Sequence, residues 1–279
     1  MSDLFGSDAY SPAQIADRVE KVGIAKAHLP FVKLFALGIL AGGFIGLGAL
    51  SFLIVVSDAS LSFAASRVLG GVAFSLGLVL VVVAGAELFT GNNLMVMALV
   101  NRRITLRLAL RNFTLVYLAN FVGAVGLAWV VARSGHLEMN EGAIREAAGH
   151  IAAAKLDLTF SEAFLRGVLC NILVCLAVWL SLAGRSVTDR ILAVIFPVSA
   201  FVAAGFEHCV ANMYLVPLAI FSNPEAGIGW GDFLLSNLLP VTFGNLFGGA
   251  GMVGLVYWTI YGRDEVTRTE TPPIESPDR

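Results

Sequence analysis

Six long apolar segments, separated by short polar stretches, dominate the hydrophobic pattern of the chain. They run over about 30–56, 68–100, 108–132, 163–183, 191–221 and 233–261. A membrane-spanning helix needs about 20 predominantly apolar residues, so each segment is long enough to cross a bilayer. The pattern predicts an all-α integral membrane protein with six transmembrane helices.

Two of these segments are too long for a single span and carry polar residues in their interior. Residues 68–100 contain "AGAELFTGNN", and residues 191–221 contain "AGFEHCVAN". Irregular backbone is tolerated at membrane depth only where protein or a cavity surrounds it. Each segment is therefore interpreted as a helix that breaks in the middle of the membrane.

The two broken segments belong to an internal repeat. When Ala84–Val96 is laid over Ala204–Val216, at an offset of 120, five of thirteen positions are identical. A second match, at an offset of 125, aligns "ANFVGAVG" (119–126) with "GNLFGGAG" (244–251). Because each half holds three spans, the second half enters the membrane from the opposite side. The sequence predicts two inverted three-helix repeats whose broken helices meet near the midplane.

The repeat suggests roles for its shared polar residues. Glu87 and Glu207 occupy matching places, and we expect their carboxylates to accept hydrogen bonds from backbone N–H groups freed by the breaks. Asn92 and Asn212 also match, and we expect them to cap the second half-helices.

His208 breaks the symmetry of the repeat, because Leu88 occupies its place in the first half. A polar residue inside a membrane is costly and marks a functional site by default. A histidine there could give a hydrogen bond or a proton to a small anion. Thr90, close after Glu87, could offer a hydroxyl from the facing half. The alternative is a core histidine that bonds a backbone carbonyl.

Composition and charge support a membrane protein and narrow its functions. The chain is 57% hydrophobic and 14% charged, with a mean hydropathy of +0.82, unlike ordinary soluble domains. A net charge of −2 gives no nucleic-acid footprint. Cys170, Cys175 and Cys209 lie in apolar runs without zinc or disulfide spacing, so we expect no metal and no cofactor.

Basic residues predict the orientation. In a six-span topology 13 of the 18 lysines and arginines fall on the side of both termini, which the positive-inside rule places in the cytoplasm. Residues 1–27 are expected to hold a cytoplasmic amphipathic helix that begins at Ser11 and Pro12. Residues 28–262 form the pore domain, and residues 263–279 a disordered cytoplasmic tail.

At these residues the sequence resembles the formate/nitrite transporter family. "GAELFTGN" (85–92) and "GFEHCVANM" (205–213) are similar to its two broken-helix motifs, the second with the histidine in place. "CNILVCLAVW" (170–179) and "PVTFGNLFGG" (240–249) are similar to helices of its formate-channel branch. The resemblance covers about residues 10–262.

The resemblance implies an aquaporin-like protomer, a homopentamer with one pore per chain, and residence in the bacterial inner membrane. It also implies a pathway for a small anion such as formate. His208 would be the central histidine and Thr90 its partner, and Lys26 and Lys155 would draw anions into the vestibules. One constriction would comprise Leu78, Leu88, Phe89 and Val174, and the other Phe74, Phe201 and Asn171.

Other functions fit the residues less well. A water or glycerol channel of the aquaporin type would carry paired Asn-Pro-Ala motifs, which this chain lacks. A membrane enzyme would need a metal cluster or a nucleophile–base pair, and His208 and Cys209, as sequence neighbours, point in different directions on a helix. A scaffold without transport would leave two polar breaks unexplained. Within the family, formate, nitrite and hydrosulfide all remain open as substrates.

Overall fold

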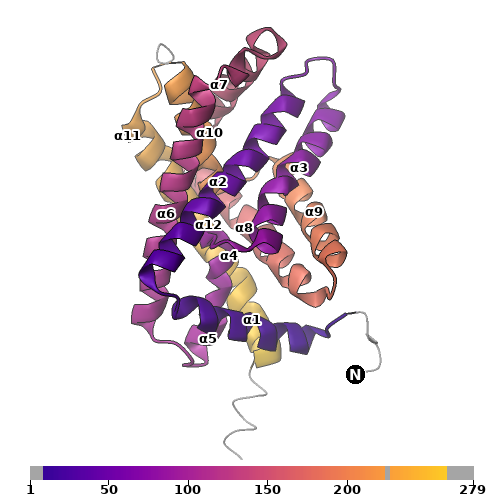
Figure 1. The fold of residues 1–279 in the computed structure, drawn as a ribbon, viewed down its shortest axis with the longest axis vertical. Coiled ribbons are helices and arrows are strands. Elements are labelled where there is room, and N and C mark those ends of the chain that lie inside the picture. Colours follow the sequence, from indigo (N-terminus) through magenta and orange to yellow (C-terminus); the bar gives the residue numbers. More distant parts are fainter. Residues whose placement is uncertain (1–8, 224–226, 263–279) are drawn as a thin grey trace, which may run out of the picture.

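In the computed structural model, which describes residues 9–223 and 227–262, the chain is almost wholly helical (Figure 1). Six helices of the described ranges are long and apolar enough to cross a membrane: Phe31–Val56, Phe63–Gly85, Leu106–Arg133, Phe160–Ala183, Val187–Ala204 and Trp230–Gly262. Large apolar side chains stay exposed on their outer faces, such as Phe196 at 74% and Leu235 at 68%. An apolar surface of this kind suits a lipid surrounding. The predicted all-α, six-span architecture is confirmed.

The helices divide into two matching halves. The first comprises α2 (Phe31–Val56), α3 (Phe63–Leu80) and α6 (Leu106–Arg133). The second comprises α8 (Phe160–Ala183), α9 (Val187–Ala204) and a last helix that includes α12 (Leu239–Leu246). Helix α2 packs against α3 and α6, and α8 packs in the same way against α9 and α12. Helices α3 and α9 contact each other across the centre, so the halves join at the segments expected to break.

Both predicted breaks are present. Helix α3 continues as a π-helical turn over Val81–Gly85, and the chain then runs extended into α4 (Phe89–Asn92) and α5 (Val96–Val100). Helix α9 ends at Ala204, and α10 (Cys209–Ser222) begins after four intervening residues. The helices after each break are too short to span a bilayer alone. Each broken segment, α3 with α4 and α5 or α9 with α10, therefore enters the membrane as two half-helices.

Both broken segments begin earlier than the hydropathy pattern suggests. Helix α3 starts at Phe63 and α9 at Val187, where Ser62 and Ser186 cap the first turns with their hydroxyls. Polar residues such as Arg67 and Asp189 lower the local hydropathy, yet they lie inside these helices. A side-chain cap satisfies the first free N–H groups and fixes the helix start.

Glycines allow the spans of each half to approach closely. A Cβ atom on Gly123 of α6 would collide with the backbone oxygen of Ile39 on α2, and a Cβ atom on Gly248 would collide with that of Val168 on α8. These two glycines are a matched pair of the sequence repeat, at an offset of 125. The repeat therefore preserves backbone contacts between spans as well as polar residues.

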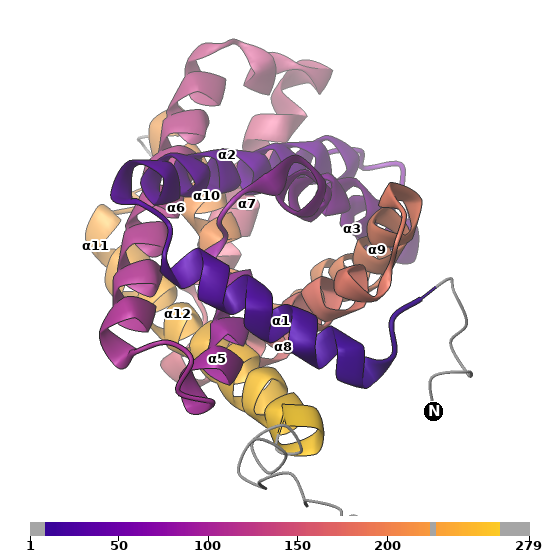
Figure 2. The ribbon, with the colours of Figure 1, turned by 60° about the horizontal axis from the view of Figure 1, so that its bottom comes forward.

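Two further helices lie at opposite ends of the molecule. Helix α1 (Pro12–Ala27) begins at a Ser11 capping box, as expected, and runs across the end that also holds α5 (Figure 2). We call this the near end. Helix α7 (Ala143–Leu156), between α6 and α8, was not predicted and lies at the opposite, far end. Short 3₁₀ turns at His136–Glu138 and Asn140–Gly142 precede it. The predicted disordered tail, 263–279, lies outside the described residues.

Candidate functional site

The two breaks share one backbone geometry. Gly85 and Gly205 both adopt left-handed conformations, with φ of 83° and 74°, which glycine reaches without steric cost. Leu88 and His208 then take extended conformations directly before α4 and α10. The two chain reversals are therefore equivalent, and they place Leu88 and His208 at corresponding points of the two halves.

Two buried asparagines satisfy the backbone groups that the breaks set free. The side-chain oxygen of Asn120 accepts from Phe89 N–H at 2.9 Å, and its amide donates to the carbonyls of Glu87 and Gly38. Asn245 repeats this pattern: its oxygen accepts from Cys209 N–H at 2.9 Å, and its amide donates to the carbonyls of Glu207 and Gly167. An amide, with both donors and an acceptor, can serve both sides of a break at once.

The expected roles of the other repeat residues are wrong in detail. Glu87 and Glu207 do not accept from freed backbone N–H groups, because their carboxylates bind side chains. Asn92 and Asn212 do not cap the half-helices; the amide of each donates to the glutamate of its own half, at 2.8 and 2.7 Å. The cap of α10 is His208 itself, whose ring nitrogen Nδ1 accepts from Ala211 N–H at 3.1 Å.

The reason is that each buried glutamate has a half-buried lysine as its partner. Lys26 Nζ lies 3.1 Å from Glu87 and 2.7 Å from the side-chain oxygen of Asn92. Lys155 Nζ lies 2.8 Å from Glu207. A buried carboxylate needs a counter-charge more than it needs a neutral N–H group. Both lysines are thus paired cations, whose charges are offset by the two glutamates.

A second asparagine pair completes these clusters. Asn112 accepts from Asn92 at 2.9 Å and donates to the carbonyl of Lys26. Asn237 accepts from Asn212 at 2.7 Å and donates to the carbonyl of Lys155. We call each set of lysine, glutamate and two asparagines a polar cluster. The near cluster lies below the first break and the far cluster above the second.

Between the breaks lies a small central cavity of about 10 Å³. Its lining is apolar apart from His208, and it brings together five of the predicted constriction residues: Phe74, Leu78, Leu88, Val174 and Phe201. The rings of Phe74 and Phe201 meet edge to face at 5.8 Å, and Phe201 stacks on the His208 imidazole at 5.9 Å. A space of this size holds about one water molecule, so the pathway is closed in this conformation.

Two predicted pathway residues lie elsewhere. The Phe89 ring does not line the central cavity; it packs against Tyr117 at 5.0 Å and Phe113 at 6.1 Å. The Asn171 side chain is fully buried and donates to the backbone oxygens of Asn245 and Thr90, at 2.6 and 3.3 Å. Asn171 therefore braces the break and does not line the cavity.

His208 and Thr90 form the link between the halves. The His208 ring nitrogen Nε2 lies 3.0 Å from the Thr90 hydroxyl. Because Nδ1 already accepts a backbone N–H, the neutral ring carries its hydrogen on Nε2 and donates to Thr90. The Thr90 hydroxyl keeps its own hydrogen, and Thr90 is fully buried behind His208, outside the lining of the three cavities. This pair can present a hydrogen-bond donor in an apolar setting.

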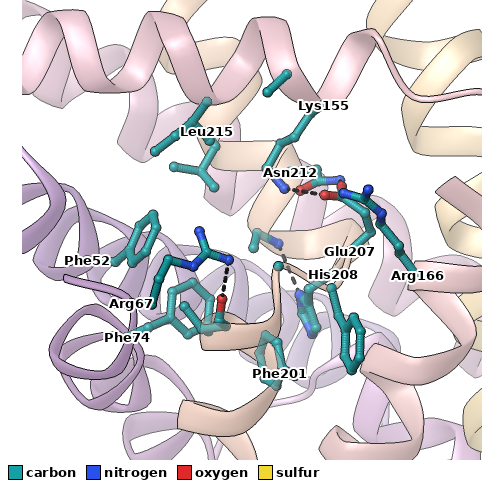
Figure 3. A pocket seen from close by; sticks show the side chains of 16 residues that line it. Phe52, Arg67, Phe74, Lys155, Arg166, Phe201, Glu207, His208, Asn212 and Leu215 are labelled. Carbon is teal, nitrogen blue, oxygen red and sulfur yellow. Dashed lines mark hydrogen bonds and ion pairs between the residues drawn. The ribbon is translucent and has the colours of Figure 1, made fainter. Parts of the chain in front are cut away.

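A vestibule opens on each side of the central cavity. The near vestibule, of about 520 Å³, lies between α1 and the spans and is lined by Lys26, Lys33 and Glu87 among mostly apolar residues. The far vestibule, of about 200 Å³, is lined by Lys155, Glu207 and His208 together with Arg67 and Arg166 (Figure 3). Phe74 and Phe201 form its floor. Apart from Phe89, Thr90 and Asn171, the predicted pathway residues thus line this series of three cavities, with Lys26 at one end, Lys155 at the other and His208 between them.

The sequence held signals for several residues whose roles were missed. Asn120 and Asn245 match at an offset of 125, and Asn112 and Asn237 share that offset. Repeated asparagines within membrane spans are costly unless each is bonded, which could have marked them as structural. No group of three histidine, cysteine, aspartate or glutamate residues that could bind a metal occurs within the described ranges.

Comparison with known proteins identifies the family. The family model described as formate/nitrite transporter matches residues 13–259. The uncharacterized transporter YrhG of Bacillus subtilis is 40% identical over 267 residues, which cover 94% of this chain and 98% of that protein. The formate channel FocA of Escherichia coli is 38% identical over 274 residues, covering 92% and 96%.

Solved structures agree with this assignment. A pentameric formate channel with formate bound is similar with a TM-score of 0.78 and 39% identity, covering 83% of this chain and 97% of that one. An ion channel of the same family gives a TM-score of 0.81 at 28% identity, covering 88% and 98%. The resemblance seen in the two broken-helix motifs is confirmed. This chain, an integral membrane protein, belongs to the formate/nitrite transporter family of channels and transporters.

Proposed function

We propose that this protein transports formate across the membrane through a pore in each chain, and that His208 couples the passage to a proton. The observation that carries the proposal is the central cavity, in which His208 is the titratable group in an otherwise apolar lining between two vestibules. Relatives named as formate channels support the choice of substrate.

The apolar lining sets the chemical problem for an anion. Stripping water from a charge is costly in free energy. A carboxylate therefore meets a barrier in the central cavity, which Phe74 and Phe201 bound on the far side and Leu78 and Leu88 on the near side. A hydrogen bond from the His208–Thr90 pair, or a proton, lowers that barrier because it offsets or removes the charge. Formic acid, which is neutral and small, crosses such a slit more easily than its anion.

The hydrogen bonds of His208 define what proton coupling requires. The neutral ring can donate a hydrogen bond through Nε2, but it can give up a proton only after Nδ1 has also been protonated. Protonation of Nδ1 breaks the bond from Ala211 N–H, a cap worth about 1 kcal/mol. We propose that this cap keeps His208 neutral at rest, and that it opens when a proton and formate are present together.

The proposal includes assembly and location. We infer a homopentamer in the inner membrane of a bacterium, with both termini in the cytoplasm. A related pentameric formate channel supports the assembly, and the excess of lysine and arginine on the side of α1 supports the orientation. In that orientation the near vestibule is cytoplasmic.

Flux into liposomes tests the function. Purified protein is reconstituted, and uptake of formate, nitrite, hydrosulfide and acetate is compared at two pH values, with protein-free liposomes as the control for diffusion of the neutral acids. The proposal predicts protein-dependent formate flux that rises as pH falls. A larger flux of nitrite or hydrosulfide than of formate would contradict formate as the substrate. The protein would still be an anion transporter.

A further inference from the structure

Arg67 occupies the far vestibule in a way that the repeat does not explain. Its Nε donates to the carbonyl of Ala203 at 2.9 Å and its Nη2 to that of Val202 at 3.0 Å (Figure 3). These are carbonyls at the C-terminal end of α9, where the helix dipole is negative and a cation is favoured. The guanidinium is therefore fixed in place by the second break.

The first break has no such cation. At the repeat offset of 120, the counterpart of Arg67 is Val187, an apolar residue that is 56% exposed. Arg166 also lacks a charged counterpart. Arg166 and Leu37 occupy equivalent positions, because their carbonyls accept from the N–H groups of Glu207 and Glu87. The far vestibule is thus the more cationic of the two, through residues that break the two-fold symmetry.

Because Lys155 is paired with a glutamate, the excess positive charge of the far vestibule comes from its arginines. Glu207 compensates Lys155 at 2.8 Å, so the net positive charge that lines the far vestibule comes from Arg67 and Arg166. Among the described residues, neither Nη1 of Arg67 nor the guanidinium of Arg166 makes a hydrogen bond or an ion pair. Arg67 is half-buried whereas Arg166 is exposed to water, so the unpaired donor of Arg67 is the one that gains from a ligand that can accept from it.

Arg67 also lies on the same side of helix α3 as Phe74, which bounds the central cavity. It precedes Phe74 on α3 by seven residues, about two helical turns, so both lie on one face of the helix. Both line the far vestibule, together with Phe201 and His208. Gly205 provides the space, since a Cβ atom there would lie 2.8 Å from Arg67 Nη2. Arg166, by contrast, is exposed at the edge of the vestibule.

We propose that Arg67 forms a binding site for a small monovalent carboxylate in the far vestibule, directly before the slit between Phe74 and Phe201. Nη1 donates to the carboxylate, and the positive charge offsets its partial loss of water. This inference rests on the proposed function, because it names where formate waits before it reaches His208. It makes Arg67 a binding residue for one side of the membrane, because the near vestibule has no cation at the equivalent position, where Val187 stands.

Charged thiol reagents can test the site independently of transport. The native cysteines that the structure describes are buried, so a single cysteine is introduced at Ala154 in the far vestibule or at Ala25 in the near one. Both alanines line their vestibules and are exposed. Pentamers in detergent are treated with anionic or cationic methanethiosulfonates, with and without formate, against chloride at equal ionic strength. Mass spectrometry gives the rates.

Arg67→Gln is expected to lower the ratio of anionic to cationic reaction rates at Ala154→Cys by about three- to tenfold, as the loss of one nearby charge implies. It should also abolish protection by formate. At Ala25→Cys neither quantity should change. Arg67→Lys keeps the charge but cannot form the planar fork, so it should keep the rate ratio and weaken the protection.

Arg166→Gln is the matched control and should leave protection by formate intact. Protection that survives Arg67→Gln, or that disappears equally in Arg166→Gln, would overturn the proposal. If Arg67→Gln does not assemble, the Ala154→Cys protein alone still decides: chloride matching the effect of formate would refute a carboxylate site. Protection at Ala154→Cys without formate flux in liposomes would overturn the proposed function and leave the site standing.

Discussion

The imidazole of His208 lies 3.0 Å from the hydroxyl of Thr90, and this hydrogen bond joins the two broken helices at the centre of the molecule. The residues are 118 positions apart in sequence and come from opposite halves of the repeat. Neither has a polar counterpart, because Val210 matches Thr90 and Leu88 matches His208. A scaffold with approximate two-fold symmetry thus holds an asymmetric donor pair, whereas the lysine, glutamate and asparagine residues of the two polar clusters, with Asn120 and Asn245, are repeated in both halves.

Replacing Asn245 with leucine should destabilise the protein severely. The change leaves Cys209 N–H and the carbonyl of Glu207 without partners in a buried site, and removes a second bond to the Gly167 carbonyl. Each such group costs about 1–3 kcal/mol. Asn120→Leu should have a similar effect on the first break. Thermal unfolding of the purified protein measures both, and Ser222→Ala, which loses one bond near the end of α10, is the control. A wild-type Tm for either asparagine variant would contradict the bracing role.

Lys155→Gln should lower the melting temperature more than the double variant Lys155→Gln, Glu207→Gln does. The single change leaves the Glu207 carboxylate, which is 3% exposed, without its counter-charge, and breaking a buried pair costs about 3–5 kcal/mol. In the double variant neutral amides can bond each other. The same comparison with Lys26 and Glu87 tests the near cluster. Equal losses in the single and double variants would show that the two charges are not coupled.

Gly205→Ala should cost more stability than Gly85→Ala. Both glycines have positive φ, and a left-handed alanine costs about 1–2 kcal/mol at either site. A Cβ atom at Gly205 also meets Arg67 Nη2 at 2.8 Å, whereas nothing lies within 4 Å of one at Gly85. Chemical unfolding curves give the difference. If the two variants are equally stable, Arg67 is not held against the break as described.

Phe201→Ala should widen the far constriction and relax its selectivity. The ring packs against both Phe74 and His208, and its removal opens space beside a cavity of about 10 Å³. Acetate flux relative to formate flux should rise severalfold, since one methyl group gives a discrimination of about 1–3 kcal/mol. Phe243→Ala, on the exposed outer face, is the matched control. An unchanged acetate-to-formate ratio would place the selective slit elsewhere.

The repeat made much of this site predictable from the sequence. Offsets of 120 and 125 located both breaks, and the mismatch of His208 with Leu88 singled out the asymmetric residue. Such features depend on spacing within one segment, which a sequence displays directly. Helix starts were less accurate, because Arg67 and Asp189 lie inside helices whose first turns are polar.

The partners of the polar residues could not be predicted. Lys155 comes from α7, an unpredicted helix, and its bond to Glu207 joins residues 52 positions apart. Phe89 follows Leu88 directly, yet its ring points toward Phe113 and Tyr117 and away from the cavity. Which side of a break a side chain occupies depends on the packing of neighbouring helices, and neither propensity nor hydropathy encodes that.

The central claim is that His208 makes formate transport depend on pH, and formate flux through His208→Asn liposomes tests it most directly. Asparagine can still cap α10, since its side-chain oxygen can accept from Ala211 N–H, but it cannot titrate. Flux is measured from about pH 5 to 8 after subtraction of protein-free liposomes, with proton movement recorded in parallel. We expect the wild-type flux to rise as pH falls. The His208→Asn variant should lose both this pH dependence and the accompanying proton uptake. A His208→Asn protein with the wild-type pH profile would contradict it.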